Sequence, residues 1–238
     1  MPQTVSVPGR FNGPLDSGHG GYSSAVIAGL VEGPAEVTLR SPVPLETPLE
    51  VQREDDGSVR VRDGGTLVAE GSPIPALELE VPDPVEVSEA RRAKSRYRGS
   101  TDDLFSHCFV CGRARDDALG VFAGAVDGRD VVASSWTPPE WTSNDSGEVL
   151  PEFLWAVMDC PTYFAVYPGD ELPMSFLGRM SARVDGPVAA GEEHVVMAWP
   201  LETDGRKRHA GAAVLSADGE PLAVAHALMI EPRETASA

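Results

Sequence analysis

The segment DSGHGGYSSAVIAGL, residues 16–30, is the most informative part of the sequence for the fold. His19, Gly20 and Gly21 stand directly before a run of small and apolar residues with helical spacing and no proline. The pattern predicts a helix that begins at a glycine-rich turn. The turn is either a plain helix entry or a place where backbone amides stay open for a ligand, and the rest of the chain must decide between the two.

The bulk composition excludes several classes of protein. The 238 residues carry a net charge of −18 at pH 7, which disfavours a nucleic-acid partner because phosphate contacts need clustered Lys and Arg. No apolar run reaches the ~18 residues of a membrane span. The N-terminal MPQTVSVPGR has no basic segment followed by an apolar block, and three cysteines are too few for a disulfide framework. We therefore expect a cytoplasmic protein with no membrane partner.

Two parts of the chain repeat each other in order. SPVPLETPLEV (41–51) aligns with GPVAAGEEHVV (186–196), and DGGTLVAEGSP (63–73) aligns with DGEPLAVAHAL (218–228). The second copy has extra residues around the basic segment TDGRKRHAG (203–211). Each match is weak alone, but their shared order predicts two related halves.

Each half also has a helix before its strands. In the second half an apolar stripe runs over residues 150–164, and Pro151 suits the first helical turn. Short apolar runs separated by Gly, Pro and Asp follow each helix and indicate antiparallel strands. The polar residues 82–103 are typical of a linker, so we expect domains at 1–81 and 104–238. The predicted class is α+β, with one sheet wrapping one central helix in each half and the two sheets set edge to edge.

Five segments carry a family resemblance: GHGGYSSAVIAGL, HCFVCGRARDDALGVFAG, LWAVMDCPTYFAV, DGPVAAGE and DGEPLAVAHAL. In them the chain resembles the double (tandem) hotdog proteins of the acyl-CoA thioesterase superfamily. The resemblance implies a double hotdog fold and hydrolysis of an acyl-CoA or acyl-carrier-protein thioester. It implies no metal and no cofactor, with coenzyme A entering only as part of the substrate. A tandem chain already contains the pairing of single hotdog proteins, so both a monomer and a homo-oligomer fit.

The candidate catalytic groups lie in different halves. The first amides of a helix have no intrahelical acceptor, so those of Gly20 and Gly21 could stabilise the oxyanion formed from a thioester. Asp159 interrupts a mostly apolar helix; it is either a surface acid near a break at Pro161 or a carboxylate that attacks the thioester or activates water. The first helix has no acid, and the second has no HGG before it. The resemblance implies that the glycine amides and the carboxylate of one site come from opposite halves, so this division is the one expected for a single composite site.

Further residues complete the predicted site. His226 is the third catalytic candidate, because the resemblance places a water-orienting glutamine near its position; a structural histidine on the sheet is the alternative. The family's Ser or Thr partner has no clean match; Leu177 or Gly178 falls near its place, with Ser175 close by. Arg206, Lys207 and Arg208 fit either the phosphates of coenzyme A or a solvated hairpin tip. The predicted substrate-binding residues are His19, Tyr22, Trp155, Thr162, Tyr163, Arg206, Lys207 and Arg208.

Cys108 and Cys111 form a lone CxxC motif. A zinc site needs about four ligands, and His107 supplies only a third. A redox pair needs a thioredoxin-like context, which is absent. We therefore expect a structural role and no metal. The leading functional hypothesis is a thioesterase; a non-catalytic acyl-CoA-binding protein and a hotdog hydratase or dehydratase are the alternatives.

Overall fold

The computed structural model describes residues 3–13, 16–100 and 103–233. Within these residues eleven strands form one sheet in the order β1-β3-β4-β5-β2-β8-β11-β10-β9-β7-β6, and every neighbouring pair is antiparallel. The strands are β1 (Thr4–Val5), β2 (Ala35–Leu39), β3 (Leu49–Arg53), β4 (Val59–Asp63), β5 (Thr66–Pro73), β6 (Gly124–Ala125), β7 (Val132–Trp136), β8 (Phe176–Val184), β9 (His194–Asp204), β10 (Lys207–Leu215) and β11 (Pro221–Ile230).

The strand order is the same in both halves when it is followed outward from the β2–β8 junction. It runs β2-β5-β4-β3-β1 on one side and β8-β11-β10-β9-β7 on the other, with β6 added at the far edge. The sequence matches superpose β3 on β9 and β5 on β11, so the topology agrees with the repeat. At the junction Val37 lies opposite Met180, and both side chains are fully buried. The two sheets are therefore continuous, as expected.

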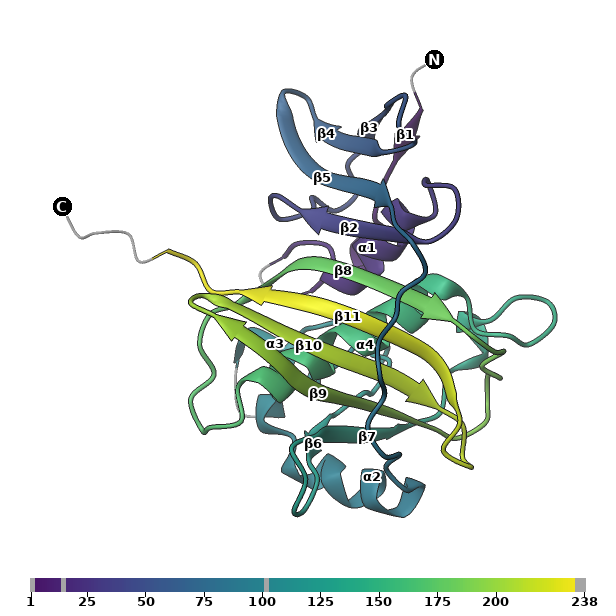
Figure 1. Cartoon of the computed structure of the whole chain (residues 1–238), viewed down its shortest axis with the longest axis vertical. Helices are drawn as coiled ribbons and strands as arrows, with labels where there is room; N and C mark the ends of the chain where they lie inside the picture. Colours follow the sequence, from purple (N-terminus) through teal and green to yellow (C-terminus); the bar gives the residue numbers. More distant parts are fainter. Residues whose placement is uncertain (1–2, 14–15, 101–102, 234–238) are drawn as a thin grey trace.

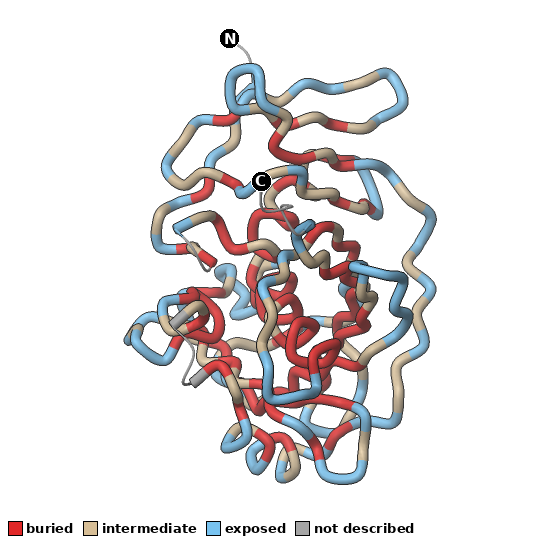
Figure 2. The backbone as a smooth tube through the Cα atoms, turned by 90° about the vertical axis from the view of Figure 1, so that its left-hand side faces the viewer, coloured by how far each residue is buried: buried red, intermediate tan, exposed pale blue. Residues whose placement is uncertain are grey.

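The two long helices lie on one face of the sheet and contact each other (Figure 1). Each precedes the junction strand of its own half: α1 comes before β2, and α4 before β8. The main core fills the space between these helices and the sheet, where the buried residues concentrate (Figure 2). The helices are α1 (Gly20–Ala28), α2 (Val87–Ala93), α3 (Asp103–Ser106) and α4 (Pro151–Val166), with short 3-10 turns η1 (Gly9–Phe11), η2 (Lys94–Arg96), η3 (Arg98–Ser100) and η4 (Glu140–Thr142).

The segment between the halves crosses the other face of the sheet (Figure 1). Residues 74–86 run as an extended strap from β5 to α2. A second, smaller core lies beneath α2 and includes Ala90 and Ala93 of that helix and Trp199 of β9. The part of the chain assigned to a linker from its polarity thus contains α2, which covers β7 and β9. In the described residues no helix is long and apolar enough to cross a membrane.

Pro161 lies inside α4, which continues to Val166. The sequence left open whether this proline ends the helix, and the structure shows that it does not. Proline at 161 removes the amide that would donate to the Val157 carbonyl, which disfavours a helix interior. Burial of nearly every side chain of α4, on both sides of the proline, holds the helix together.

Candidate active site

Asp159 is the only carboxylate among the buried residues of the described chain, with 6% of its surface exposed. It lies in the middle of α4, and its Oδ2 accepts a hydrogen bond of 2.7 Å from the Gly21 amide. Gly21 belongs to the first turn of α1, where amides have no intrahelical acceptor and carry the positive end of the helix dipole. The acid of the second half and the helix N-terminus of the first half therefore meet.

The two glycines are required by this contact. A Cβ on Gly21 would lie 2.5 Å from the Trp155 carbonyl oxygen and 2.7 Å from Asp159 Cβ. A Cβ on Gly20 would lie 2.9 Å from Asp159 Oδ2 and 3.0 Å from two Leu177 side-chain atoms. The sequence suggested that glycine lets a substrate approach the backbone. The structure adds that glycine lets α1 approach α4.

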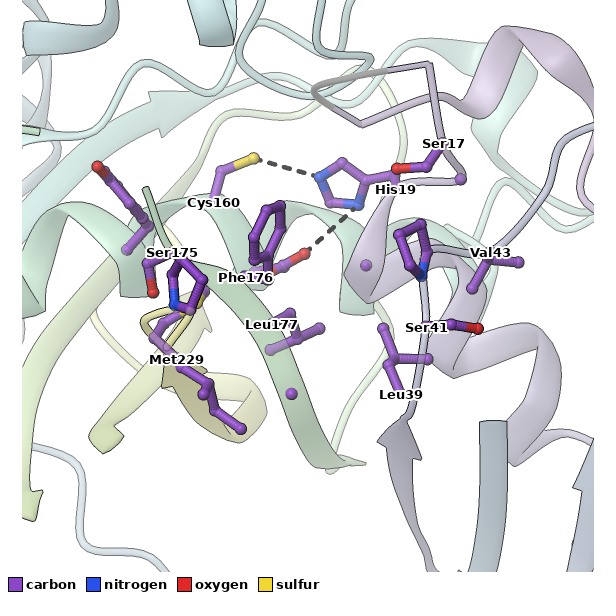
Figure 3. Close-up of a pocket in the computed structure, with 18 of the residues that line it drawn as sticks. Ser17, His19, Leu39, Ser41, Val43, Cys160, Ser175, Phe176, Leu177 and Met229 are labelled. Carbon is purple, nitrogen blue, oxygen red and sulfur yellow. Dashed lines mark hydrogen bonds and ion pairs between the residues drawn. The ribbon is translucent and has the colours of Figure 1, made fainter. Parts of the chain in front are cut away.

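His19 connects Asp159 to a group of thiols. It is the N-cap of α1, with 1% of its surface exposed, and its Nδ1 lies 3.6 Å from Asp159 Oδ2 and 3.4 Å from the Tyr22 amide nitrogen. Its Nε2 lies 3.2 Å from the Cys160 sulfur. Figure 3 shows the His19 ring beside the Cys160 sulfur, with a dashed line joining the two. This histidine is thus held inside the molecule.

Burial governs the electrostatics of the pair. Burial alone would lower the pKa of His19, but the hydrogen bond and charge of Cys108, together with the Asp159 carboxylate, raise it above its ordinary value. Burial raises the pKa of Asp159, and the opposing effects of His19 and the Gly21 amide do not cancel it. Asp159 is consequently a stronger base than an exposed carboxylate.

A pocket of about 380 Å³ opens beside this pair (Figure 3). It is lined from both halves: the N-terminus of α1 and the chain after β2 on one side, and α4, β8 and the end of β11 on the other. Arg40 and Arg206 add two guanidinium groups. Much of the wall is apolar, and serine hydroxyls add polar groups. Besides His19 and Cys160, the labelled lining residues are the apolar Leu39, Val43, Phe176, Leu177 and Met229 and the serines Ser17, Ser41 and Ser175.

The structure brings only some of the predicted site residues to this pocket. His19, Gly20, Asp159, Tyr163 and Arg206 line it. Three of the predicted substrate-binding residues are instead buried: Tyr22 stacks on Phe11 in the core with ring centroids 4.2 Å apart, Trp155 is buried in α4, and Thr162 donates to the Asp159 carbonyl at 2.6 Å. The remaining two lie outside the pocket: Lys207 is exposed, and Arg208 pairs with Glu231 at 2.9 Å.

His226 lies on the opposite face of the sheet from Asp159. Side chains alternate along a strand, and Val224 belongs to the core beneath α2 while Ala225 belongs to the core beneath α4. His226 therefore shares the outer face with Val224, where its Nε2 lies 3.0 Å from His209 Nδ1. The prediction that His226 acts beside Asp159 is corrected on this ground, because a strand pattern shows which residues share a face but not which face meets the helices.

Sequence reasoning missed Cys160, Arg40 and the β8 residues Phe176 and Leu177 as parts of this site. Cys160 follows Asp159 directly and was visible only as an odd third cysteine. The β8 residues lie beside the position where the family's Ser or Thr was sought. No local pattern marks them, because their place in the pocket depends on how β8 packs beside α1.

The fold is shared with a solved structure over nearly the whole chain. The tesB protein of Mycobacterium avium subspecies paratuberculosis covers 97% of this chain and 96% of its own, with a TM-score of 0.58 and 13% sequence identity. A thioesterase superfamily protein covers 66% and 69% at a TM-score of 0.48 and 18% identity, and the Escherichia coli PaaI protein covers 50% and 88% at 0.44 and 13%. No family model matches the sequence, and no curated protein matches it. The tesB match and the single antiparallel sheet confirm the resemblance at the level of a hotdog-type fold.

Proposed function

We propose that this protein is a double hotdog thioesterase with one composite site, hydrolysing an acyl thioester of coenzyme A or of an acyl carrier protein. One observation carries the proposal: Asp159 Oδ2 accepts from the Gly21 amide at 2.7 Å, beside a pocket lined from both halves. The volume of about 380 Å³ and its apolar wall suit a short or medium acyl chain. Arg206 supplies positive charge for the phosphates of either carrier, whereas Arg40, which also lines the pocket, pairs with Glu70 at 2.6 Å.

Asp159 is proposed as the general base. It takes a proton from a water molecule whose oxygen attacks the thioester carbon, and the carbonyl oxygen becomes an oxyanion. First-turn amides of α1 stabilise that charge. Gly21 already holds Asp159, so the amide of Gly20, which lines the pocket, is the proposed donor. Collapse breaks the carbon–sulfur bond, and the leaving thiolate receives the proton from Asp159.

The proposal is tested with a panel of acyl-CoA thioesters of increasing chain length. Released coenzyme A is measured by chromatography, because the protein's own three cysteines would react with a thiol reagent. Asp159→Asn keeps the shape of the side chain and is expected to lower kcat/KM by roughly 100-fold to 10,000-fold. Asp218→Asn, a change at an exposed hairpin acid, is the matched control and should leave kcat/KM unchanged.

The same panel separates the alternatives. Saturable binding without release of coenzyme A by the wild type would favour an acyl-CoA-binding protein. Hydration of an enoyl-CoA would favour the hydratase. Equal activity of the wild type and Asp159→Asn would remove Asp159 from the mechanism. Activity on acyl-carrier-protein thioesters but not on acyl-CoA would identify the carrier and leave the reaction class intact.

A further inference from the structure

Two of the three cysteines, Cys108 and Cys160, gather around His19. The Cys160 sulfur lies 3.2 Å from His19 Nε2 and 3.7 Å from the Cys108 sulfur. The candidate ligand atoms of His19, Cys108 and Cys160 all lie within 4.8 Å of one another. They come from three separate places: the N-terminus of α1, the loop that follows α3, and the middle of α4. Thioesterase chemistry as proposed above uses none of the sulfurs.

Two of the separations are close to those that a tetrahedral zinc ion imposes. Two sulfurs each ~2.3 Å from such an ion lie about 3.8 Å apart, and a sulfur and a nitrogen lie about 3.5 Å apart. The observed separations are 3.7 Å for Cys108 and Cys160 and 3.2 Å for Cys160 and His19. Thiolate and imidazole ligands together select zinc over the hard cations magnesium and calcium.

Cys111 is the natural fourth ligand. It is fully buried in the same loop as Cys108, and CxxC is the ligand spacing of structural zinc sites. The loop makes a tight turn around the two cysteines: the Gly112 amide donates to the Cys108 carbonyl at 2.8 Å, and a Cβ at 112 would lie 2.4 Å from that oxygen. The Tyr97 hydroxyl donates to the Cys111 carbonyl at 2.9 Å.

We propose that the thiolates of Cys108, Cys111 and Cys160 and the Nε2 of His19 bind one zinc ion beside the candidate active site. The ion binds three thiolates and a neutral imidazole, so binding releases the protons that these groups carry and leaves a complex with one net negative charge. Cys108 and Cys160 line the pocket, which gives the ion an entry path. The ion closes a tetrahedral structural site that ties α1, the cysteine loop and α4 together.

The surroundings of His19 suit this role. A histidine that binds a metal through one ring nitrogen usually donates from the other to a carboxylate. His19 Nδ1 lies 3.6 Å from Asp159 Oδ2. In this structure Nδ1 accepts from the Tyr22 amide at 3.4 Å. Zinc on Nε2 would place the ring proton on Nδ1 and so exchange this long bond for one to Asp159, beside the candidate base. His107, the third ligand considered from the sequence, is exposed and is not part of the site.

The test uses the full chain without a polyhistidine tag, purified under reducing conditions without chelator. Inductively coupled plasma mass spectrometry should find about one zinc ion per chain. His19→Ala and Cys111→Ser should each weaken zinc binding at least tenfold, since each removes one of about four ligands. His107→Ala is the matched control and should keep the metal. X-ray absorption at the zinc edge should show three sulfurs and one nitrogen.

A measurement on the wild type keeps the proposal falsifiable if the variants do not fold. Zinc is removed by chelator and replaced by cobalt(II), which should give thiolate-to-cobalt charge-transfer absorption and tetrahedral ligand-field bands. Zinc should also protect all three thiols from alkylation. The proposal is overturned if the reduced wild type binds neither metal and its thiols alkylate equally with and without zinc. A Cys108–Cys160 disulfide with no metal uptake after reduction would equally overturn it, in favour of a redox pair.

Discussion

At the scale of single residues, the burial of Asp159 is the feature that marks the candidate site. Removing a carboxylate from water is costly, and here the Gly21 amide and His19 offset burial only in part, so the pKa of Asp159 stays raised. Titratable groups in such surroundings are concentrated at functional sites. The sequence singled out this acid because it interrupts an apolar helix. It could not show the neighbour His19, which lies far away along the chain and reaches Asp159 only in the folded state.

His226 is a second titratable residue whose surroundings have a measurable consequence. Burial, with further contributions from His209 and Arg179, lowers its pKa below the ordinary value of 6.5. The unfolded chain then binds a proton at this residue more readily than the native state does, so stability is lost as pH falls below the unfolded pKa. Between about pH 7.5 and about pH 5.5, His226→Gln should therefore lose less stability than the wild type.

Urea unfolding of both proteins across this pH range measures the effect. His107→Gln, a change at an exposed histidine, serves as the control and should follow the wild type. Parallel pH dependence of wild type and His226→Gln would show that His226 does not contribute to acid destabilisation.

Among the helices, the contact between α1 and α4 determines the site. The start of α1 at Gly20 could be predicted from the glycine turn, and the second helix from its apolar stripe and Pro151. Their close approach could not, because it depends on how both helices pack against the joined sheets. The continuation of α4 through Pro161 was equally beyond local rules, since tertiary burial overrides the unfavourable proline.

The approach of α1 to α4 predicts the effect of Gly21→Ala. The new methyl group would lie 2.5 Å from the Trp155 carbonyl oxygen, a backbone atom that cannot move independently of α4. Overpacking of this kind costs about 1–3 kcal/mol, which exceeds the gain of up to ~1 kcal/mol from replacing a helical glycine. Gly21→Ala should therefore lower the free energy of unfolding, measured by urea titration.

Gly29→Ala is the matched control at the other end of α1. A Cβ there would have its nearest neighbours at 3.6 Å, an ordinary contact, and the backbone φ of −63° suits alanine. This variant should be neutral or slightly stabilised. If Gly21→Ala were as stable as Gly29→Ala, the close helix contact would not be present in solution.

The molecule consists of two halves that are connected in two ways, by the β2–β8 pairing and by the segment 74–86. The repeat in the sequence predicted this arrangement, because hairpin patterns and helix positions are local and survive low identity. The way the halves connect was not predictable: residues 74–86 form a strap over the outer face, and a polar segment gives no sign of the contacts that anchor it. Arg183 donates to the Leu77 carbonyl at 2.7 Å, and Arg129 donates to the Pro84 carbonyl at 2.9 Å.

The junction should hold the halves together without the covalent strap. The β2–β8 pairing, the α1–α4 contact and the shared core all cross between the halves, whereas Glu80 in the strap is exposed. We expect that a protease site inserted at Glu80 can be cut while the two fragments still elute together from a size-exclusion column. Burial of apolar surface across the junction supplies the free energy that replaces the tether.

Two controls interpret the cleavage experiment. The uncut insertion protein should elute at the same volume as the cut protein, and the cut protein should separate into two fragments in denaturant. Fragments that separate under native conditions would show that the strap, and not the junction, holds the halves together. Because the pocket is lined from both halves, the cut protein should also keep the activity of the uncut one, which links the composite site directly to the joined sheet.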